Sequence, residues 1–356
     1  MDRRRTVHRL IETHFTAFRK SQRRTISDLS TGLLARGTLS LAEIARGMDD
    51  ATTVRHRIKR AWRFMRNDRV APALATEVLS RWTLSNPTVE VVVAIDWTDL
   101  GEYQLLAAKV AVASRAVPLA WLVMKKRRFT RRRKSRNDAE EQLIERLRGA
   151  LAGRRWVLVG DRGFARAALF RKLNAWGIDY VIRASGNVWI DSCGFSGILD
   201  NVPRRAGRLS YRKVRYHKRE RVPTRLALTH CEPAPEPWYL VTNVATAAHA
   251  VRLYRKRMWI EEGFRDAKST LGLKRAWLSG AERMERLMIL VAVVMLLAIL
   301  VGLRYRRRFG QRDPQLSTKR RGGSLSVFRT GLELIRQHGP PPDLDRIPLL
   351  SPEDDT

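Results

Sequence analysis

The chain has 356 residues, of which 69 are Lys or Arg and 35 are Asp or Glu, so its formal net charge is +34 at pH 7. Hydrophobic residues make up 44% of the sequence, enough for a buried core, which excludes a wholly disordered chain, and the length predicts two or three domains. Its two cysteines exclude a disulfide framework and a four-cysteine zinc site. The N-terminal segment lacks the apolar core of a signal peptide, which favours a cytoplasmic protein.

The excess of cations is distributed over every region of the chain rather than gathered in one tail. A charge spread in this way favours a long polyanion that contacts all parts of the protein, and nucleic acid is the natural candidate. The alternatives are a solvated basic surface or a genome whose composition favours Arg.

Residues 1–87 are predicted to form a helical domain that binds DNA. The segment 38–48 begins with Thr and Ser before an apolar run, and a short turn leads to a basic helix over 54–67. A helix, a short turn and a basic helix are typical of a helix-turn-helix. A small helical bundle with a basic exposed face is the alternative. The predicted DNA contacts are those of the basic helix, namely Arg55, Arg57, Lys59 and Arg63.

Residues 88–185 change to a pattern of strands and then of alternating helices and strands. Three apolar, β-branched runs end near Leu100, Ser114 and Lys125, and a stretch with nine Lys or Arg in residues 125–136 predicts an exposed loop. An amphipathic helix, a strand, a helix and another strand follow. The order βββαβαβ predicts an α/β protein with a mixed sheet, as in a ribonuclease H-like core.

The rest of the chain is predicted to complete this core around an insertion. Residues 186–245 contain short strand-like runs and predict a β-rich insertion, and 246–303 predict two long helices that form the second part of the core. Residues 304–356 combine a basic segment, one helix and a Pro-rich tail. The segment 287–303 has no charge and is also at the short limit for a membrane span, but we expect a buried core helix and no membrane.

Two acidic residues come directly after apolar strands. Asp96 follows the first strand and Asp161 follows VLVG, at the edge of an α/β sheet where functional sites are usually built. Asp is also a common turn former, so either residue alone favours a structural role.

The predicted helix after residue 245 supplies a third acid. Five residues, spaced by 3, 4, 4 and 3 positions, fall within roughly 80° of one helical face at about 100° per residue. A solvated stripe with i,i+4 ion pairs is the alternative. These residues are Tyr254, Arg257, Glu261, Arg265 and Lys268.

Three carboxylates without His or Cys suit hard cations, so Asp96, Asp161 and Glu261 are predicted to bind Mg²⁺, or Mn²⁺, rather than zinc. A pair of such ions activates a nucleophile and stabilises the leaving oxygen in phosphodiester cleavage.

The chain resembles the DDE transposases of insertion sequence family four. The spacing Tyr254-x2-Arg257-x3-Glu261-x6-Lys268 matches their Tyr-Arg-Glu-Lys signature, and AIDWTDL and VGDRGF resemble their two aspartate motifs. The resemblance implies a ribonuclease H-like core interrupted by a β insertion. It also implies cut-and-paste transposition, with Asp96, Asp161 and Glu261 as the catalytic metal ligands.

The same resemblance implies roles for the cations and for an aromatic residue. Tyr254, Arg257 and Lys268 would hold DNA at the cleavage point, with Arg265 where relatives often have another cation. Trp238 would stack on a flipped base during hairpin formation, although a core Trp is equally compatible with its strand.

The implied partners are the terminal inverted repeats, target DNA and a second copy of the chain, at the nucleoid. A structure-selective nuclease and an inactive DNA-binding derivative remain alternatives.

Overall fold

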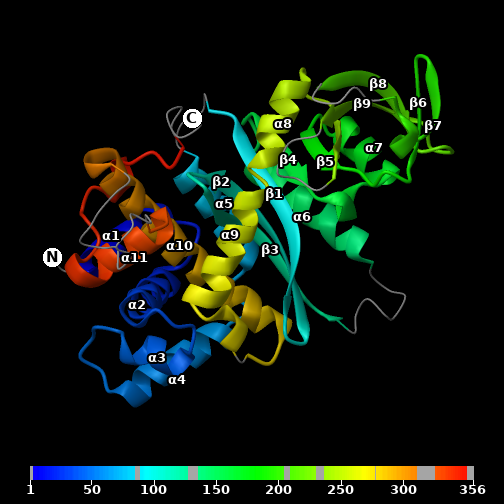
Figure 1. Cartoon of the computed structure of the whole chain (residues 1–356). Helices are drawn as coiled ribbons and strands as arrows, with labels where there is room; N and C mark the ends of the chain where they lie inside the picture. Colours follow the sequence, from blue (N-terminus) through cyan, green and yellow to red (C-terminus); the bar gives the residue numbers. More distant parts are fainter. Residues whose placement is uncertain are drawn as a thin grey trace. The chain divides into compact units, whose positions relative to one another are not determined.

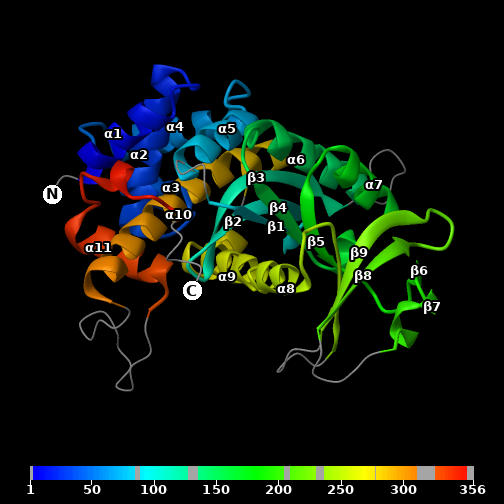
Figure 2. The ribbon, with the colours of Figure 1, turned by 90° about the horizontal axis from the view of Figure 1, so that it is seen from above.

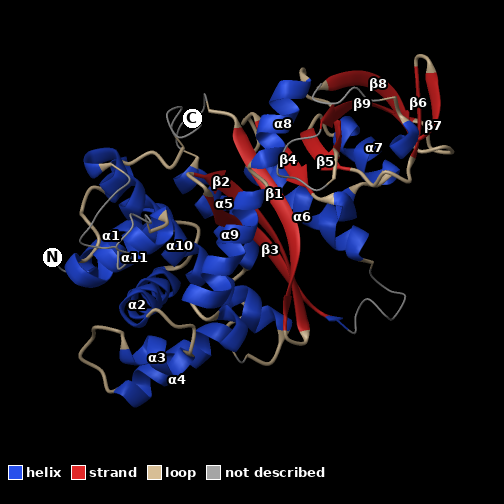
Figure 3. Ribbon diagram, in the orientation of Figure 1, coloured by secondary structure: helices blue, strands red, loops and turns tan. Residues whose placement is uncertain are grey.

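The computed structural model divides into two compact units that share strand β1 and helix α9 (Figure 1). It describes residues 3–84, 89–126, 135–203, 209–229, 236–276, 278–310 and 325–350. Unit 1 comprises Met1–Val89, Trp97–Gly153 and Glu261–Thr356, and unit 2 comprises Glu90–Asp96 and Arg154–Ile260. Both units combine helices and strands (Figure 3), so the predicted mixed α/β class is confirmed.

Unit 1 is mostly helical, and three of its helices, α4, α6 and α11, begin at a side chain that accepts a free backbone N–H group. The Thr53 hydroxyl accepts the N–H of His56 at the start of α4, and Ser135 and Asp138 form a reciprocal capping box at the start of α6. The helices are α1 (Arg3–His14), α2 (Lys20–Arg36), α3 (Leu41–Arg46), α4 (Val54–Arg66), α5 (Pro72–Thr83), α6 (Arg136–Ala150), α10 (Ala281–Phe309) and α11 (Val327–His338). The predicted pair of helices around the turn at 49–53 is therefore present as α3 and α4.

The strands of unit 1 lie in the order β3-β2-β1, with β1 (Val91–Leu100) continuing into unit 2. The strands β2 (Tyr103–Val112) and β3 (Arg115–Lys125) form an antiparallel hairpin. Its two turn residues, Ala113 and Ser114, have φ of 45° and 63°, the left-handed values that a tight two-residue hairpin turn requires. The three predicted strands are confirmed.

Unit 2 contains a mixed sheet in the order β1-β4-β5-β10-β9-β8-β6-β7. Strands β1, β4 and β5 are parallel, and the remaining neighbours are antiparallel. Helices α7 and α8 lie on opposite faces of this sheet (Figure 2). The elements are β4 (Trp156–Gly160), α7 (Ala167–Ala175), β5 (Asp179–Arg183), β6 (Trp189–Ser192), β7 (Phe195–Ile198), β8 (Ser210–Tyr216), β9 (Val222–Thr229), β10 (Trp238–Thr242) and α8 (Ala247–Arg255).

The segment 186–245, predicted as an insertion, supplies β6 to β10 and continues the sheet of unit 2, because β10 pairs with β5. Most of the predicted Arg-rich loop, residues 127–134, lies outside the described residues, as do 311–324 of the C-terminal basic segment and 351–356 of the tail.

Helix α10 is six residues longer than predicted, because the cations after Leu303 continue the helix to Phe309. Among the described residues it is the one helix long and apolar enough to cross a membrane, yet its most apolar stretch is wholly buried in the protein. It packs against α11, β3, α2, α4 and α5 within unit 1. This burial accounts for its composition, as expected for a core helix.

Helices α10 and α11 approach each other so closely that two glycines are required. A Cβ at Gly331 would lie 1.7 Å from the carbonyl oxygen of Ala298, and a Cβ at Gly302 would lie 2.0 Å from that of Val327. Neither backbone oxygen can move without shifting a buried helix. The contact therefore requires glycine at both positions in the core of unit 1.

We expect Gly331→Ala to destabilise the protein by about 2–3 kcal/mol, because the added methyl group overpacks the contact between the helices. The matched control is Gly149→Ala in α6, where a Cβ meets nothing within 4 Å and Ala should stabilise by roughly 0.5–1 kcal/mol. Urea unfolding of both variants tests this. An unchanged midpoint for Gly331→Ala would contradict the close approach.

Candidate active site

Asp96 and Asp161 follow paired residues of two neighbouring parallel strands. In β1 and β4, Ile95 pairs with Gly160, so Asp96 is the next residue of β1 and Asp161 is the first residue after β4. The prediction that Asp96 ends its strand is wrong, because β1 continues to Leu100. Parallel strands lie about 4.8 Å apart, and side chains at the same register point to the same face. Both side chains are partly exposed. The structure thus brings these two predicted acids together.

A cation continues this row on the third parallel strand. Gly160 also pairs with Ile182 of β5, so Arg183 takes the position next to Asp161. Arg183 donates to Glu236 at 2.9 Å, and Arg162 donates to the same carboxylate at 2.8 Å. Sequence reasoning missed Arg183, although its place directly after a buried strand is the same signal that singled out the aspartates.

The Asp161 side chain is oriented by its own backbone. Its Oδ1 accepts the N–H of Gly163 at 2.9 Å, and this bond caps the short 3₁₀ turn Arg162–Phe164. Its other carboxylate oxygen stays outside this bond. Asp161 therefore caps a turn, which agrees with the structural role that the sequence left open. The same bond orients its side chain, as a metal ligand requires.

We expect Asp161→Ala to lower the free energy of unfolding by about 1 kcal/mol through loss of the cap, and Asp161→Asn to retain most of the stability, because an amide oxygen still accepts the Gly163 N–H. Chemical denaturation compares the two. Unchanged stability of Asp161→Ala would show that the cap contributes nothing.

Tyr254, Trp238 and Arg257 form a second cluster in unit 2. The rings of Trp238 and Tyr254 meet edge to face at 4.9 Å, and the Arg257 guanidinium lies 5.8 Å from the Tyr254 ring centroid. Burial raises the pKa of the Tyr254 phenol, against the opposing influence of Arg257 and Arg183. Trp238 is only partly buried, so part of its side chain is exposed to solvent in addition to its contact with Tyr254.

The prediction of one continuous helix beyond residue 245 is wrong, so the alignment of five side chains on one face loses the regular helix on which it was based. Helix α8 ends at Arg255 and α9 (Met258–Arg265) follows after a tight turn, in which the N–H groups of Lys256 and Arg257 bond three residues back. Residues 266–270 then form a π-helical turn. Each interruption rotates the residues that follow it, so a constant 100° per residue does not apply.

Glu261, Arg265 and Lys268 belong to unit 1. Glu261 is exposed, Arg265 is ion-paired with Glu262 at 2.7 Å, and the Lys268 ammonium donates to the Thr98 hydroxyl. In the part of the chain that the structure describes, no group of three or more His, Cys, Asp or Glu side chains is arranged to hold a metal ion. The register of β1 and β4 puts Asp96 and Asp161 on neighbouring strands, and the roles of Asp96, Asp161 and Glu261 as metal ligands stay predictions.

In the N-terminal helices, three of the four predicted DNA contacts are exposed on α4, namely Arg55, Lys59 and Arg63. Arg57 differs, because its guanidinium bonds Asp50 at 2.9 Å and the carbonyl oxygens of Met48, Asp50 and Thr52. Its side chain is only 17% exposed. It therefore holds the turn between α3 and α4, and its contact with DNA stays a prediction.

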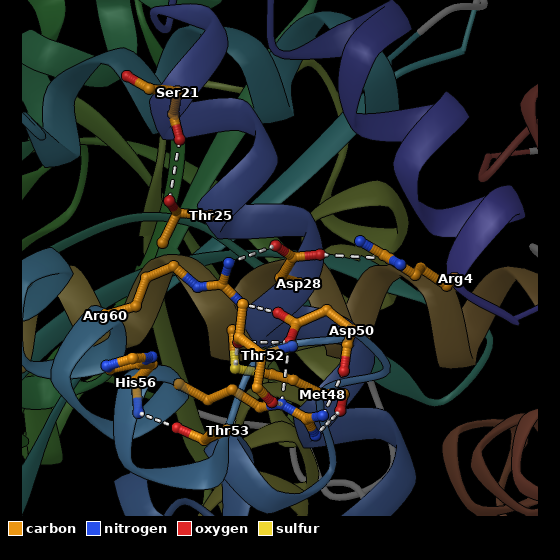
Figure 4. Close-up of polar contacts among 11 residues, drawn as sticks. Arg4, Ser21, Thr25, Asp28, Met48, Asp50, Thr52, Thr53, His56 and Arg60 are labelled. Atoms are coloured by element: carbon orange, nitrogen blue, oxygen red, sulfur yellow. Dashed lines mark hydrogen bonds and ion pairs between the residues drawn. The ribbon is translucent and has the colours of Figure 1, made fainter.

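Two acids that sequence reasoning missed tie α4 to its neighbours (Figure 4). Arg60 pairs with Asp50 and lies 3.5 Å from buried Asp28, which also lies 3.6 Å from Arg4 of α1. Burial raises the pKa of Asp28, against the pull of Arg60. Burial also opposes ionisation of Asp50, but hydrogen bonds from Thr52 and Arg60 outweigh it and hold its pKa well below the ordinary value.

We expect Arg57→Ala to destabilise the protein by about 1–3 kcal/mol, since it leaves buried acceptors in the turn without a donor. The double variant Lys59→Ala/Arg63→Ala should keep wild-type stability and weaken binding to a duplex. Loss of two phosphate contacts would reduce the slope of log affinity against log salt by about 1.8. Thermal unfolding and anisotropy titrations at several salt concentrations measure these effects. An unchanged salt slope would exclude these two side chains from the interface.

The mixed sheet, with Asp96 and Asp161 directly after the paired residues Ile95 and Gly160, defines an α/β protein with a candidate acidic site on two neighbouring parallel strands. Residues 120–297, half of the chain, match the transposase DDE domain family, and the chain belongs to this family. The match includes Asp161 and Glu261 and begins after Asp96. No curated protein matches the chain. The protein is therefore a DDE transposase, of a class that acts on DNA with divalent metal ions.

The side chains of the aspartate pair fit such an ion. Asp96 and Asp161 supply hard oxygen donors from neighbouring strands, and the bond that orients Asp161 leaves one of its carboxylate oxygens for another ligand. Oxygen ligands of this kind suit Mg²⁺ and Mn²⁺.

Proposed function

We propose that this transposase works by cut and paste, as a member of insertion sequence family four. The observation that carries the proposal is the register of β1 and β4, in which Asp96 and Asp161 come directly after the paired residues Ile95 and Gly160, in a chain of the DDE family. The net charge of +34 supports simultaneous contact with element ends and target DNA.

In this proposal Asp96, Asp161 and Glu261 hold two Mg²⁺ ions, or Mn²⁺. Bound there, the metal would supply a nucleophile at neutral pH and neutralise charge on the phosphate oxygens. The contribution of the chain is to fix the carboxylates: strand pairing locks the two aspartates, and the Gly163 N–H orients Asp161.

The cations of the signature would position the DNA. Arg257 beside the Tyr254 ring offers guanidinium donors for a phosphate, and Arg183 places a further cation next to Asp161. Lys268 and Arg265 would hold a neighbouring phosphate. Trp238, which presents the part of its ring not covered by the core, would stack on a flipped base.

The reaction needs no ATP, because each joining step exchanges one phosphodiester bond for another. Water first attacks a phosphorus atom and releases a 3′-hydroxyl at the end of the element. That hydroxyl attacks the opposite strand to form a hairpin, water reopens the hairpin, and the freed 3′-hydroxyl attacks target DNA. Two copies of the chain would pair two terminal inverted repeats through their N-terminal helices, at the nucleoid in the cytoplasm.

We expect Asp96→Asn, Asp161→Asn and Glu261→Gln each to reduce Mg²⁺-dependent cleavage of the inverted repeats that flank the gene by at least about 10³-fold, since each removes a charged ligand. Gel analysis of end-labelled duplexes measures cleavage, hairpins and joined products.

The matched control is Asp99→Asn. Asp99 lies on the same strand, where its carboxylate bonds Gln104 at 3.1 Å and pairs with Lys126 at 3.3 Å, and this substitution should leave cleavage close to wild type. Full activity of any of the three acid variants would overturn the assignment of that acid. Cleavage without joining would support a nuclease instead.

A further inference from the structure

The tip of the β2–β3 hairpin is joined to the segment that carries Glu261 by a three-residue clamp. Arg115, the first residue of β3, lies 3.4 Å from the carboxylate of Glu262 and 3.0 Å from that of Asp266. The side chains of Arg115 and Asp266 are only 16% and 6% exposed. Because the planar guanidinium reaches both carboxylates at once, it holds α9 and the π-helical turn together.

The backbones meet beside this clamp. A Cβ at Gly263 would lie 2.9 Å from the carbonyl oxygen of Ala116, so only glycine permits the contact between α9 and β3. Lys109 of β2, which is 1% exposed, places its ammonium 3.4 Å from the centroid of the Phe264 ring. Helix α9 is thus fixed to both strands of the hairpin.

The clamp also sets the π-helical turn. The carbonyl oxygen of Asp266 accepts the N–H of Leu271 at 3.1 Å, five residues ahead, while its carboxylate pairs with Arg115. Lys268 lies inside this turn and donates to Thr98 of β1. The clamp residues Glu262 and Asp266 therefore stand between Glu261 and Lys268 in the sequence and fix the path of the chain that joins them.

This arrangement has an energetic cost. Ala113 and Ser114 next to Arg115 adopt left-handed φ values that non-glycine residues rarely take. Burial raises the pKa of Asp266 to about 6, with Glu262 adding to the shift and Arg115, Arg329 and Lys109 opposing it. A buried carboxylate that resists ionisation contributes little to stability at neutral pH, and such costs are common where a functional site must be held in one geometry.

We propose that Arg115 and Asp266 are positioning residues of the transposase, which hold Glu261 and Lys268 in their working geometry by clamping α9 and the π-helical turn to the β2–β3 hairpin. This proposal rests on the proposed function, because it takes Glu261 as the catalytic glutamate that the clamp positions.

The test compares Arg115→Met, Arg115→Lys and Asp266→Asn in the full chain. The matched control is Arg36→Met, which removes an Arg–Glu pair of 2.6 Å with Glu43 in the N-terminal helices. Three quantities are measured at pH 7.5: nicking of supercoiled plasmid with Mg²⁺ or Mn²⁺, affinity for a duplex, and hydrogen exchange of residues 258–270 by mass spectrometry.

We expect Arg115→Met to accelerate exchange in 258–270 and reduce nicking at least about tenfold, with duplex affinity within about twofold of wild type, and Arg115→Lys to recover part of the activity. Asp266→Asn should also reduce nicking at least about tenfold without lowering the melting temperature. At pH 7.5 Asp266 is ionised, because this pH is above its raised pKa. Holding this charge in a buried place destabilises the folded protein, so we expect its removal not to lower the free energy of unfolding.

Several results would overturn the proposal. Nicking that stays at wild-type level in Arg115→Met or Asp266→Asn would do so, and so would an equal loss in Arg36→Met. A purely structural role would lower nicking, affinity and melting temperature together in all clamp variants. If Arg115→Met does not fold, Asp266→Asn and Arg115→Lys decide. A wild-type protein that never nicks DNA would overturn the proposed function, and hydrogen exchange would then show separately whether the clamp holds residues 258–270.

Discussion

The parallel pairing of β1 with β4 is the interaction on which the site depends. With Ile95 opposite Gly160, Asp96 and Asp161 follow at the same register of neighbouring strands, and the pairing of Gly160 with Ile182 places Arg183 next to Asp161. A shift of one residue in either register would turn the aspartates to opposite faces. Strand pairing thus holds two carboxylates on neighbouring strands. A bound divalent cation or the adjacent Arg183 would offset the repulsion between them.

The large positive charge shapes the interior as well as the surface. Arginines that would otherwise repel one another are held by a few buried or half-buried acids: Asp28 and Asp50 hold α4, and Glu262 and Asp266 hold Arg115. Because an arginine can bind several acceptors at once, one acid network can join three elements. Some acids of this basic protein therefore serve as partners of structural arginines, and others, on β1 and directly after β4, are the candidate metal ligands.

In the segment from Ala247 to Thr270 the spacing of the signature residues was recognised, but the predicted helix geometry was wrong. The spacing of Tyr254, Arg257, Glu261 and Lys268 suggested a single helical face, but the chain turns at 256–257 and widens into a π-helix after Arg265. Tyr254, just before the first break, packs against Trp238, and Asp266, at the start of the π-helical turn, pairs with Arg115.

By itself the sequence predicted most element types, the α/β class, the place of Asp161 directly after its strand and the DDE transposase family, because hydrophobic periodicity, β-branched runs and residue spacing are local properties. It placed Asp96 at a strand end, whereas β1 continues to Leu100. It also predicted α10 as a core helix from its composition. Only the tertiary structure decided that Asp96 and Asp161 share a register, that Arg183 joins them, that Arg57 holds a turn and that α8 and α9 are separate helices. Strand register and the partners of Arg183 and Arg57 depend on contacts between separate segments of the chain, and no local pattern encodes which strand pairs with which.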